Sequence, residues 1–149
     1  MKIVQTPKLS PELINLPFKI EGNKVYVKYY EQGVQAGFPS PAEDFKEIPL
    51  SLDEKYLQNP EATYLIKVVG DSMFPTLMVG DILIVKANLE LKHLNIAIVS
   101  INNTDYTVKR FDKKKKLLIP DNKDFLPISL KEDDTLVCLG VVKHLIRDL

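Results

Sequence analysis

The stretch V-V-G-D-S-M-F-P-T-L-M-V-G-D-I-L-I-V at residues 68–85 is the part of the chain that decides the fold. Two short apolar runs of the kind that form strands enclose a polar turn. Gly70 permits backbone angles that other residues avoid, so we expect a sharp turn that leaves Ser72 at the start of a helical turn, among free N–H groups. A serine so placed has the geometry of a nucleophile. A loop with a capping serine explains the same local pattern, so the case for catalysis depends on a partner for Ser72.

Size and composition limit the classes of function. The chain has 149 residues, 45% of them hydrophobic, which fits one globular domain with a modest core. Lys and Arg number 20 and Asp and Glu number 20, so the net charge of zero disfavours direct binding to DNA or to an anionic membrane. No apolar run approaches the length of about 18 residues that a membrane span needs. The polar N-terminus, broken by Pro7, is unlike a secretory signal, and the sequence predicts a cytoplasmic protein.

Metal and redox chemistry have little support in the sequence. The single cysteine, Cys138, lies in an apolar run and is predicted to be a buried structural thiol. With one cysteine and only His93 and His144 as histidines, no metal-ligand spacing can be assembled. We therefore expect neither a metal nor another cofactor.

The first half of the chain is predicted to be irregular. Prolines interrupt residues 1–17, which indicates an extended arm, and residues 18–20 and 25–27 fit a small hairpin. Residues 32–44 are rich in glycine and proline and are predicted to be an exposed linker, the kind of backbone that a protease accepts. One short helix is expected over residues 51–58, where Ser51 and Glu54 form a capping-box pattern.

The second half has the period of strands. We expect a mostly-β domain of partly curled sheets, because short apolar runs alternate with turn formers. The predicted strands are residues 64–69, 82–86, 96–101, 106–111, 117–119 and 135–146.

A serine hydroxyl needs a base to become a strong nucleophile, and neither histidine has a convincing context. A lysine can replace histidine if burial lowers its pKa from about 10.4 to near 7, a change of roughly 4 to 5 kcal/mol. Lys109, in Y-T-V-K-R-F, is the candidate. On a strand it shares a face with Thr107 while Arg110 points to the other side, so Lys109 can be drawn inward beside Ser72. An exposed strand lysine fits the local sequence equally well.

Two segments together carry a family resemblance. G-D-S-M-F-P-T-L-M-V-G-D at residues 70–81 and T-V-K-R-F at residues 107–111 resemble the Ser/Lys peptidases of the LexA, phage repressor and UmuD group. The box S-M-F-P-T-L also resembles that of bacterial signal peptidases, which are membrane-anchored. Ala36-Gly37 followed by F-P-S-P-A-E-D is similar to the self-cleavage region of UmuD-type proteins. The first 36 residues are too short and too proline-broken for the repressors' DNA-binding domain, which favours the UmuD branch.

The resemblance implies a LexA/UmuD-like peptidase fold and a self-cleavage mechanism. Ser72 would be the nucleophile, Lys109 the general base and acid, and the backbone N–H groups of Asp71 and Ser72 the oxyanion hole. Cleavage between Ala36 and Gly37 would remove a flexible arm, residues 1–36, from a linker at residues 37–50 and a peptidase domain at residues 51–149.

The same resemblance implies a place in the SOS response to DNA damage. Cleavage would be stimulated by RecA filaments on single-stranded DNA. The product, a homodimer, would serve as accessory subunit of an error-prone Y-family (UmuC-type) translesion polymerase. Two alternatives stay open: a non-catalytic scaffold that binds polymerase or RecA, and a soluble signal-peptidase-like protease that acts on other proteins.

Overall fold

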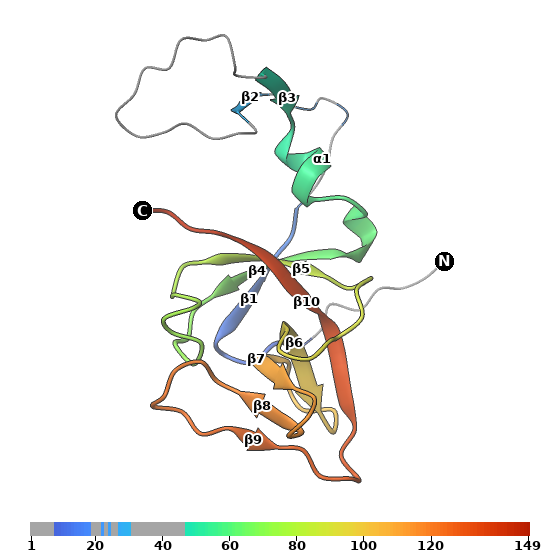
Figure 1. The fold of residues 1–149 in the computed structure, drawn as a ribbon, viewed down its shortest axis with the longest axis vertical. Helices are drawn as coiled ribbons and strands as arrows, with labels where there is room; N and C mark the ends of the chain where they lie inside the picture. Colours follow the sequence, from blue (N-terminus) through green and yellow to red (C-terminus); the bar gives the residue numbers. More distant parts are fainter. Residues whose placement is uncertain (1–7, 19–21, 23, 25–26, 31–46) are drawn as a thin grey trace. The chain divides into compact units, whose positions relative to one another are not determined.

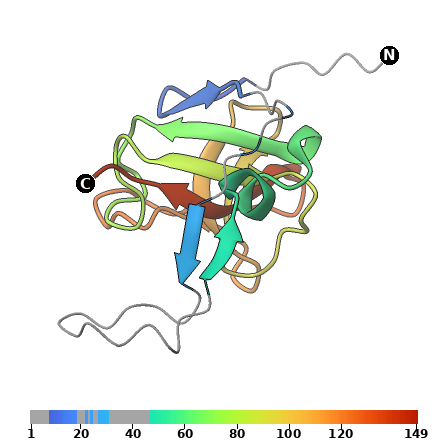
Figure 2. The same ribbon diagram turned by 90° about the horizontal axis from the view of Figure 1, so that it is seen from above.

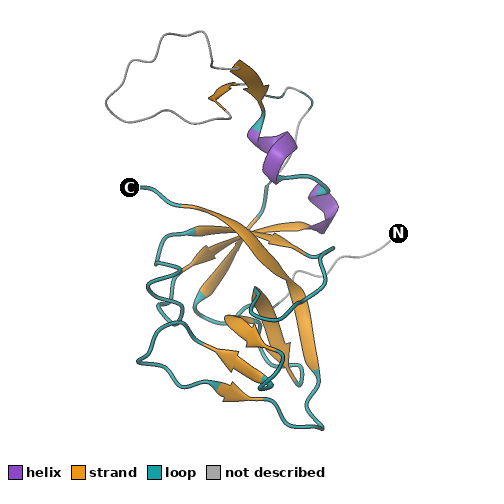
Figure 3. Cartoon of the chain, viewed as in Figure 1, coloured by secondary structure: helices purple, strands orange, loops and turns teal. Residues whose placement is uncertain are grey.

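The structure, a computed structural model, describes residues 8–18, 22, 24, 27–30 and 47–149 (Figure 1). These residues fall into two units, one made of residues up to Phe18 and from Asn59 onward, the other of residues between Lys19 and Gln58. Strands predominate and helix is confined to short segments (Figure 3), so the predicted mostly-β class is confirmed. Among the described residues, no helix has the length and apolar character to cross a bilayer.

The larger unit is built on one eight-stranded antiparallel sheet, in the order β1-β4-β5-β10-β6-β7-β8-β9. All six predicted strands of the second half are present, each within a residue of its predicted bounds. The strands of the sheet are β1 (Leu13–Leu16), β4 (Thr63–Val68), β5 (Ile82–Lys86), β6 (Ile96–Ile101), β7 (Thr107–Asp112), β8 (Leu117–Ile119), β9 (Ile128–Ser129) and β10 (Leu136–Ile146).

The long strand β10 curls the sheet, because its first half pairs with β6 and its second half with β5. Its register shifts between Cys138 and Gly140 and again between Val142 and His144, and such irregularities bend and twist a strand. A Cβ at Gly140 would lie 2.8 Å from Val85 Cγ1, so β5 approaches here as closely as only glycine allows. Figure 2 shows β1 (blue), β4 (green), β5 (yellow-green) and β10 (red) lying side by side in this order.

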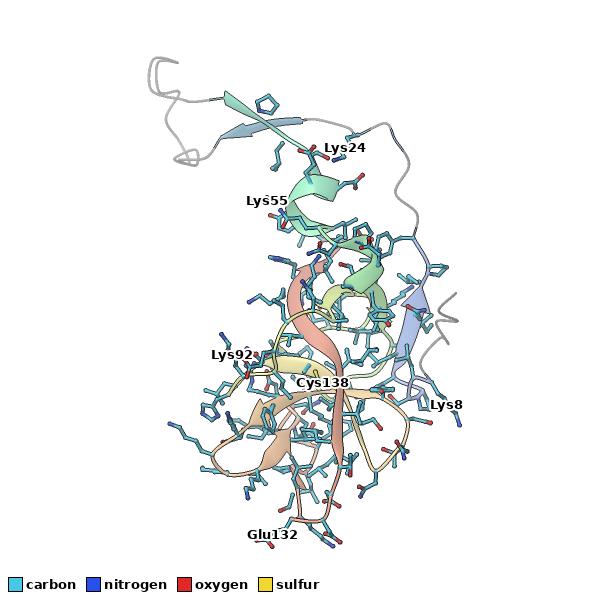
Figure 4. The ribbon with its side chains drawn as sticks, turned by 90° about the vertical axis from the view of Figure 1, so that its right-hand side faces the viewer. Lys8, Lys24, Lys55, Lys92, Glu132 and Cys138 are labelled. Atoms are coloured by element: carbon cyan, nitrogen blue, oxygen red, sulfur yellow. The ribbon has the colours of Figure 1, made fainter. Side chains whose placement is uncertain are left out.

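Two apolar clusters fill the curled sheet. The first joins β1, β4, β5, β6 and β7 to the turn after β4, and contains Leu13, Ile66, Val68, Met73, Leu77, Leu83, Val85, Ile98 and Val108. The second, centred on Ala97, Val99 and Leu118, includes the half-buried Cys138 on β10 (Figure 4). Burial raises the pKa of the Cys138 thiol, which favours its unreactive form.

The first strand corrects the prediction of an irregular arm. Of the described residues before Phe18, Leu13–Leu16 pair antiparallel with β4, with Leu13 opposite Val68 and Leu16 opposite Leu65. The prolines precede and follow this strand without interrupting it, and Leu13 supplies the apolar side chain that packs into the first cluster. Without β1, β4 would be the edge strand of the sheet with unpaired backbone N–H and C=O groups, and β1 pairs with these groups.

The smaller unit contains β2 (Val27–Tyr30), β3 (Glu47–Leu50) and helix α1 (Leu52–Tyr56). A 3-10 helix, η2 (Pro60–Ala62), belongs to the larger unit and precedes β4. Val27, at the end of the predicted hairpin, pairs with Leu50 of β3. Most of that hairpin, including residues 19–20 and 25–26, and all of the glycine- and proline-rich linker at residues 32–44 lie outside the described residues. The short helix predicted over residues 51–58 is confirmed, but the capping box is wrong. Ser51 is buried and makes no side-chain cap, and Glu54 accepts a hydrogen bond from Lys24 Nζ at 3.0 Å instead.

Candidate active site

Ser72 opens a tight turn directly after β4. The Phe74 N–H donates to the Asp71 carbonyl at 3.1 Å, and the Leu77 N–H donates to the Met73 carbonyl at 3.0 Å. The side chains of Met73 and Leu77 are buried in the first apolar cluster, and this packing holds the turn against the core. As a result, Ser72 is only 4% exposed, and its hydroxyl is enclosed by protein atoms.

Gly70 has a different role from the predicted one. Its φ is not in the left-handed region, so conformational freedom is not what the turn requires of it. A Cβ at Gly70 would instead lie 2.5 Å from the Cβ and 3.3 Å from the Cα of Glu12. The glycine is therefore needed because the segment before β1 passes directly over it.

Lys109 reaches the same place from β7, in the other half of the sheet. Its Nζ donates hydrogen bonds to Ser72 Oγ at 3.2 Å, to Thr107 Oγ1 at 3.0 Å and to the Val108 carbonyl at 2.9 Å. Its exposed fraction is 8%. The structure thus brings together the serine and lysine singled out in the sequence, with Thr107 on the same face of the strand.

Arg110 points elsewhere, as the strand period requires, but it does not extend freely into solvent. Its guanidinium forms a two-pronged ion pair with Asp121, with distances of 2.9 and 2.7 Å, and also donates to the Leu94 carbonyl. This pair joins β7 to the loop after β8, because a planar guanidinium matches both carboxylate oxygens. The hydrogen bond from Arg110 lowers the pKa of Asp121, with burial acting in the opposite direction.

Glu12 is the member of the site that sequence reasoning missed. Its Oε2 accepts a hydrogen bond from Ser72 Oγ at 2.8 Å, and its Oε1 accepts bonds from Thr107 Oγ1 and from Lys109 Nζ, the latter at 3.2 Å. Burial works against ionisation of this carboxyl, but the bond from Thr107, the charge of Lys109 and the bond from Ser72 together lower its pKa below the ordinary value.

No local pattern marks Glu12 in the sequence. It lies between Pro11 and Leu13 in the predicted arm, 60 positions from Ser72 and 97 from Lys109. The apolar residues around it, Leu9, Leu13 and Leu16, are spaced four and three residues apart, so they lack the period of two that would predict a strand.

Asn122 fixes the two carbonyls that flank Ser72. Its backbone N–H donates to the Ser72 carbonyl at 3.0 Å, and its side-chain amide donates to the Asp71 carbonyl at 2.9 Å. Each carbonyl shares a peptide plane with the following N–H, so these bonds fix the orientation of the N–H groups of Ser72 and Met73. Ala36 and Gly37, the predicted cleavage site, lie outside the described residues.

Comparisons with known proteins agree with these features. The family described as Peptidase S24-like matches residues 19–143. Protein MucA of Salmonella typhimurium is 37% identical over 121 residues, covering 79% of this chain and 82% of that protein. Protein ImpA of Salmonella typhimurium is 30% identical over 133 residues, covering 88% and 91%. The LexA repressor of Acidithiobacillus ferrooxidans is 42% identical over 120 residues, covering 76% of this chain but 58% of the repressor.

Proposed function

Because this chain belongs to the peptidase S24-like family, as a UmuD-type member of a group of self-cleaving serine peptidases, we propose that it cuts its own Ala36–Gly37 bond with Ser72 as nucleophile and Lys109 as general base. One observation carries the proposal: Lys109 Nζ lies 3.2 Å from Ser72 Oγ in a buried site. General-base catalysis requires such hydrogen-bond reach between the nucleophile and its base.

The chemistry proceeds in two halves. Neutral Lys109 accepts the Ser72 proton while Oγ attacks the carbonyl carbon of Ala36, and the N–H groups of Asp71 and Ser72 stabilise the oxyanion. Each such donor typically contributes about 3 kcal/mol to lowering the barrier. Lys109 then gives its proton to the nitrogen of Gly37, the peptide bond breaks, and residues 1–36 remain as an ester on Ser72. Water attacks that ester and loses its proton to Lys109, which passes it to Ser72 Oγ as the ester bond breaks, so the arm leaves with a new carboxyl end and the dyad is restored.

The cellular role follows from the family. Residues 1–36 form the removable arm, residues 37–50 the linker and residues 51–149 the peptidase domain. A RecA filament on single-stranded DNA stimulates cleavage, and the product from Gly37 onward acts in the cytoplasm as a homodimeric accessory subunit of a UmuC-type Y-family polymerase. The likeness to MucA and ImpA over most of their lengths supports this role.

The test follows the mass of the purified full chain at pH 9.5, where more lysine is neutral. The wild type is expected to yield fragments 1–36 and 37–149, while Ser72→Ala and Lys109→Met stay intact, with rates at least about a thousandfold lower. Ser129→Ala on β9 and Lys143→Met on β10, which alter exposed residues, serve as matched controls and should cleave like the wild type. Fragments of the same masses from Ser72→Ala would refute the proposal.

A further inference from the structure

We propose that residues 8–16, the inhibitory segment, hold Ser72 and Lys109 inactive through the carboxylate of Glu12 until the segment is displaced. The inference rests on the proposed function, because it concerns the same serine and lysine, and it adds the means by which a chain that carries its own substrate avoids premature cleavage.

The inhibitory segment is bound along its length, on two sides. At its start, the Tyr106 N–H donates to the Lys8 carbonyl at 3.0 Å and the Ser10 N–H donates to the Tyr106 carbonyl at 2.7 Å. At its end, β1 pairs with the edge of β4, as Figure 1 shows. Glu12 lies between these two attachments, so its position is set by the backbone.

The segment is also anchored next to the serine itself. The Glu12 carbonyl accepts hydrogen bonds from the N–H groups of Val69 at 2.7 Å and Gly70 at 3.2 Å, just before Ser72. Leu9 and Leu13 pack against the first apolar cluster on either side of this point. The addition of an extended chain to a sheet edge is one of the modes by which proteins bind peptides.

The ion pair in the site matches an inactive state. Lys109 acts as a base only when neutral, whereas its Nζ is ion-paired with the Glu12 carboxylate at 3.2 Å. Among the described residues, Glu12 is the acidic side chain that forms an ion pair with Lys109. The Ser72 proton points to Glu12 Oε2, and Lys109 donates to Ser72 Oγ, so the direction of donation is opposite to that needed for attack.

Glu12 itself is poorly suited to act as the general base in place of Lys109. Although burial opposes its ionisation, its hydrogen bonds and the neighbouring lysine lower its pKa, and a carboxyl that ionises so readily has little affinity for a serine proton. The contact therefore restrains Ser72 without activating it.

The same carboxylate occupies the space that a substrate needs. Attack requires the scissile carbonyl carbon to come within about 3 to 3.5 Å of Ser72 Oγ, and Glu12 Oε2 already lies 2.8 Å from that oxygen. The inhibitory segment must leave before Ala36 can enter. Cleavage after Ala36 then cuts the tether between the segment and the peptidase domain, which makes activation irreversible.

The test compares Glu12→Gln and Glu12→Asp with the control Glu90→Gln, an exposed acid in the connection between β5 and β6. Two rates are measured at pH 7.5 on the full chain: self-cleavage by mass, and labelling of Ser72 by a fluorophosphonate, which bonds to Oγ with loss of fluoride. Glutamine removes the charge, and aspartate keeps it but reaches one methylene less. Both Glu12 variants should accelerate both reactions, Glu12→Gln at least about tenfold, while Glu90→Gln leaves them unchanged.

Unchanged or slower labelling in both Glu12 variants would overturn the inference, because Glu12 would then be idle or would assist catalysis. Faster labelling without cleavage in any variant would uphold the inhibitory contact and refute self-cleavage. If one variant fails to fold by circular dichroism, the other decides the result.

Discussion

Replacing Leu13 by alanine tests whether β1 is packed onto the sheet as the structure has it. The Leu13 side chain is 5% exposed and lies in the first apolar cluster, whereas its neighbour Ile14 faces outward and is 48% exposed. Truncating a core leucine to alanine typically costs about 2 to 5 kcal/mol. Because β1 is a four-residue edge strand whose surroundings can partly close, we expect the lower part of that range, about 2 to 3 kcal/mol.

The free energy of unfolding is measured by urea denaturation at pH 7, in a Ser72→Ala background that keeps the chain intact. Ile14→Ala is the matched control from the same strand and should lose less than about 1 kcal/mol. Equal losses for the two variants, or a loss below about 1 kcal/mol for Leu13→Ala, would refute the inward packing of Leu13.

Two further predictions concern the turn and the ion pair near it. Asn122→Ala should slow self-cleavage by about tenfold with little change in stability, because the Asp71 carbonyl loses the side-chain amide that fixes its peptide plane and with it the Ser72 N–H; an unchanged rate of fragment formation would contradict this. Stability should fall as pH drops below about 4, since the lowered pKa of Asp121 contributes stability that is present above its ordinary pKa and lost on protonation. Arg110→Met should flatten that part of the curve, which urea midpoints measured from pH 7 to 2.5 would show; an unaltered slope would count against the pair.

Local pattern was sufficient for six of the eight strands of the sheet but not for β1, β9 or the whole site. The strands β4 to β8 and β10 are apolar runs of the strand period bounded by turn formers, and these signals lie within the segments themselves. Ser72 and Lys109 were found because family motifs surround them. The role of Gly70 was misjudged because its neighbour, Glu12, comes from a distant part of the chain.

Long-range contacts account for the other errors. β1 is a strand because β4 offers it an open edge and the cluster around Val68 offers a place for Leu13, and neither is visible in residues 1–17. The capping box failed for a similar reason. Ser51 is buried and Glu54 binds Lys24, so tertiary contacts replaced a local pair that the sequence pattern favours.

The burial of Leu13 also gives an estimate of the free energy that a partner must supply to displace the inhibitory segment. If burial of Leu13 contributes about 2 to 3 kcal/mol to docking of the inhibitory segment, it lowers the population of the open state, in which the segment is undocked, by a factor of about 30 to 150. A tethered substrate needs such a restraint, because its effective concentration is high at all times. A partner that binds the open chain more tightly than the closed one, by a factor of this size, would release Ser72. Leu13→Ala, with Ser72 intact, should therefore imitate the partner and cleave faster at neutral pH, with Ile14→Ala remaining at the wild-type rate; equal rates would show that docking of β1 does not limit cleavage.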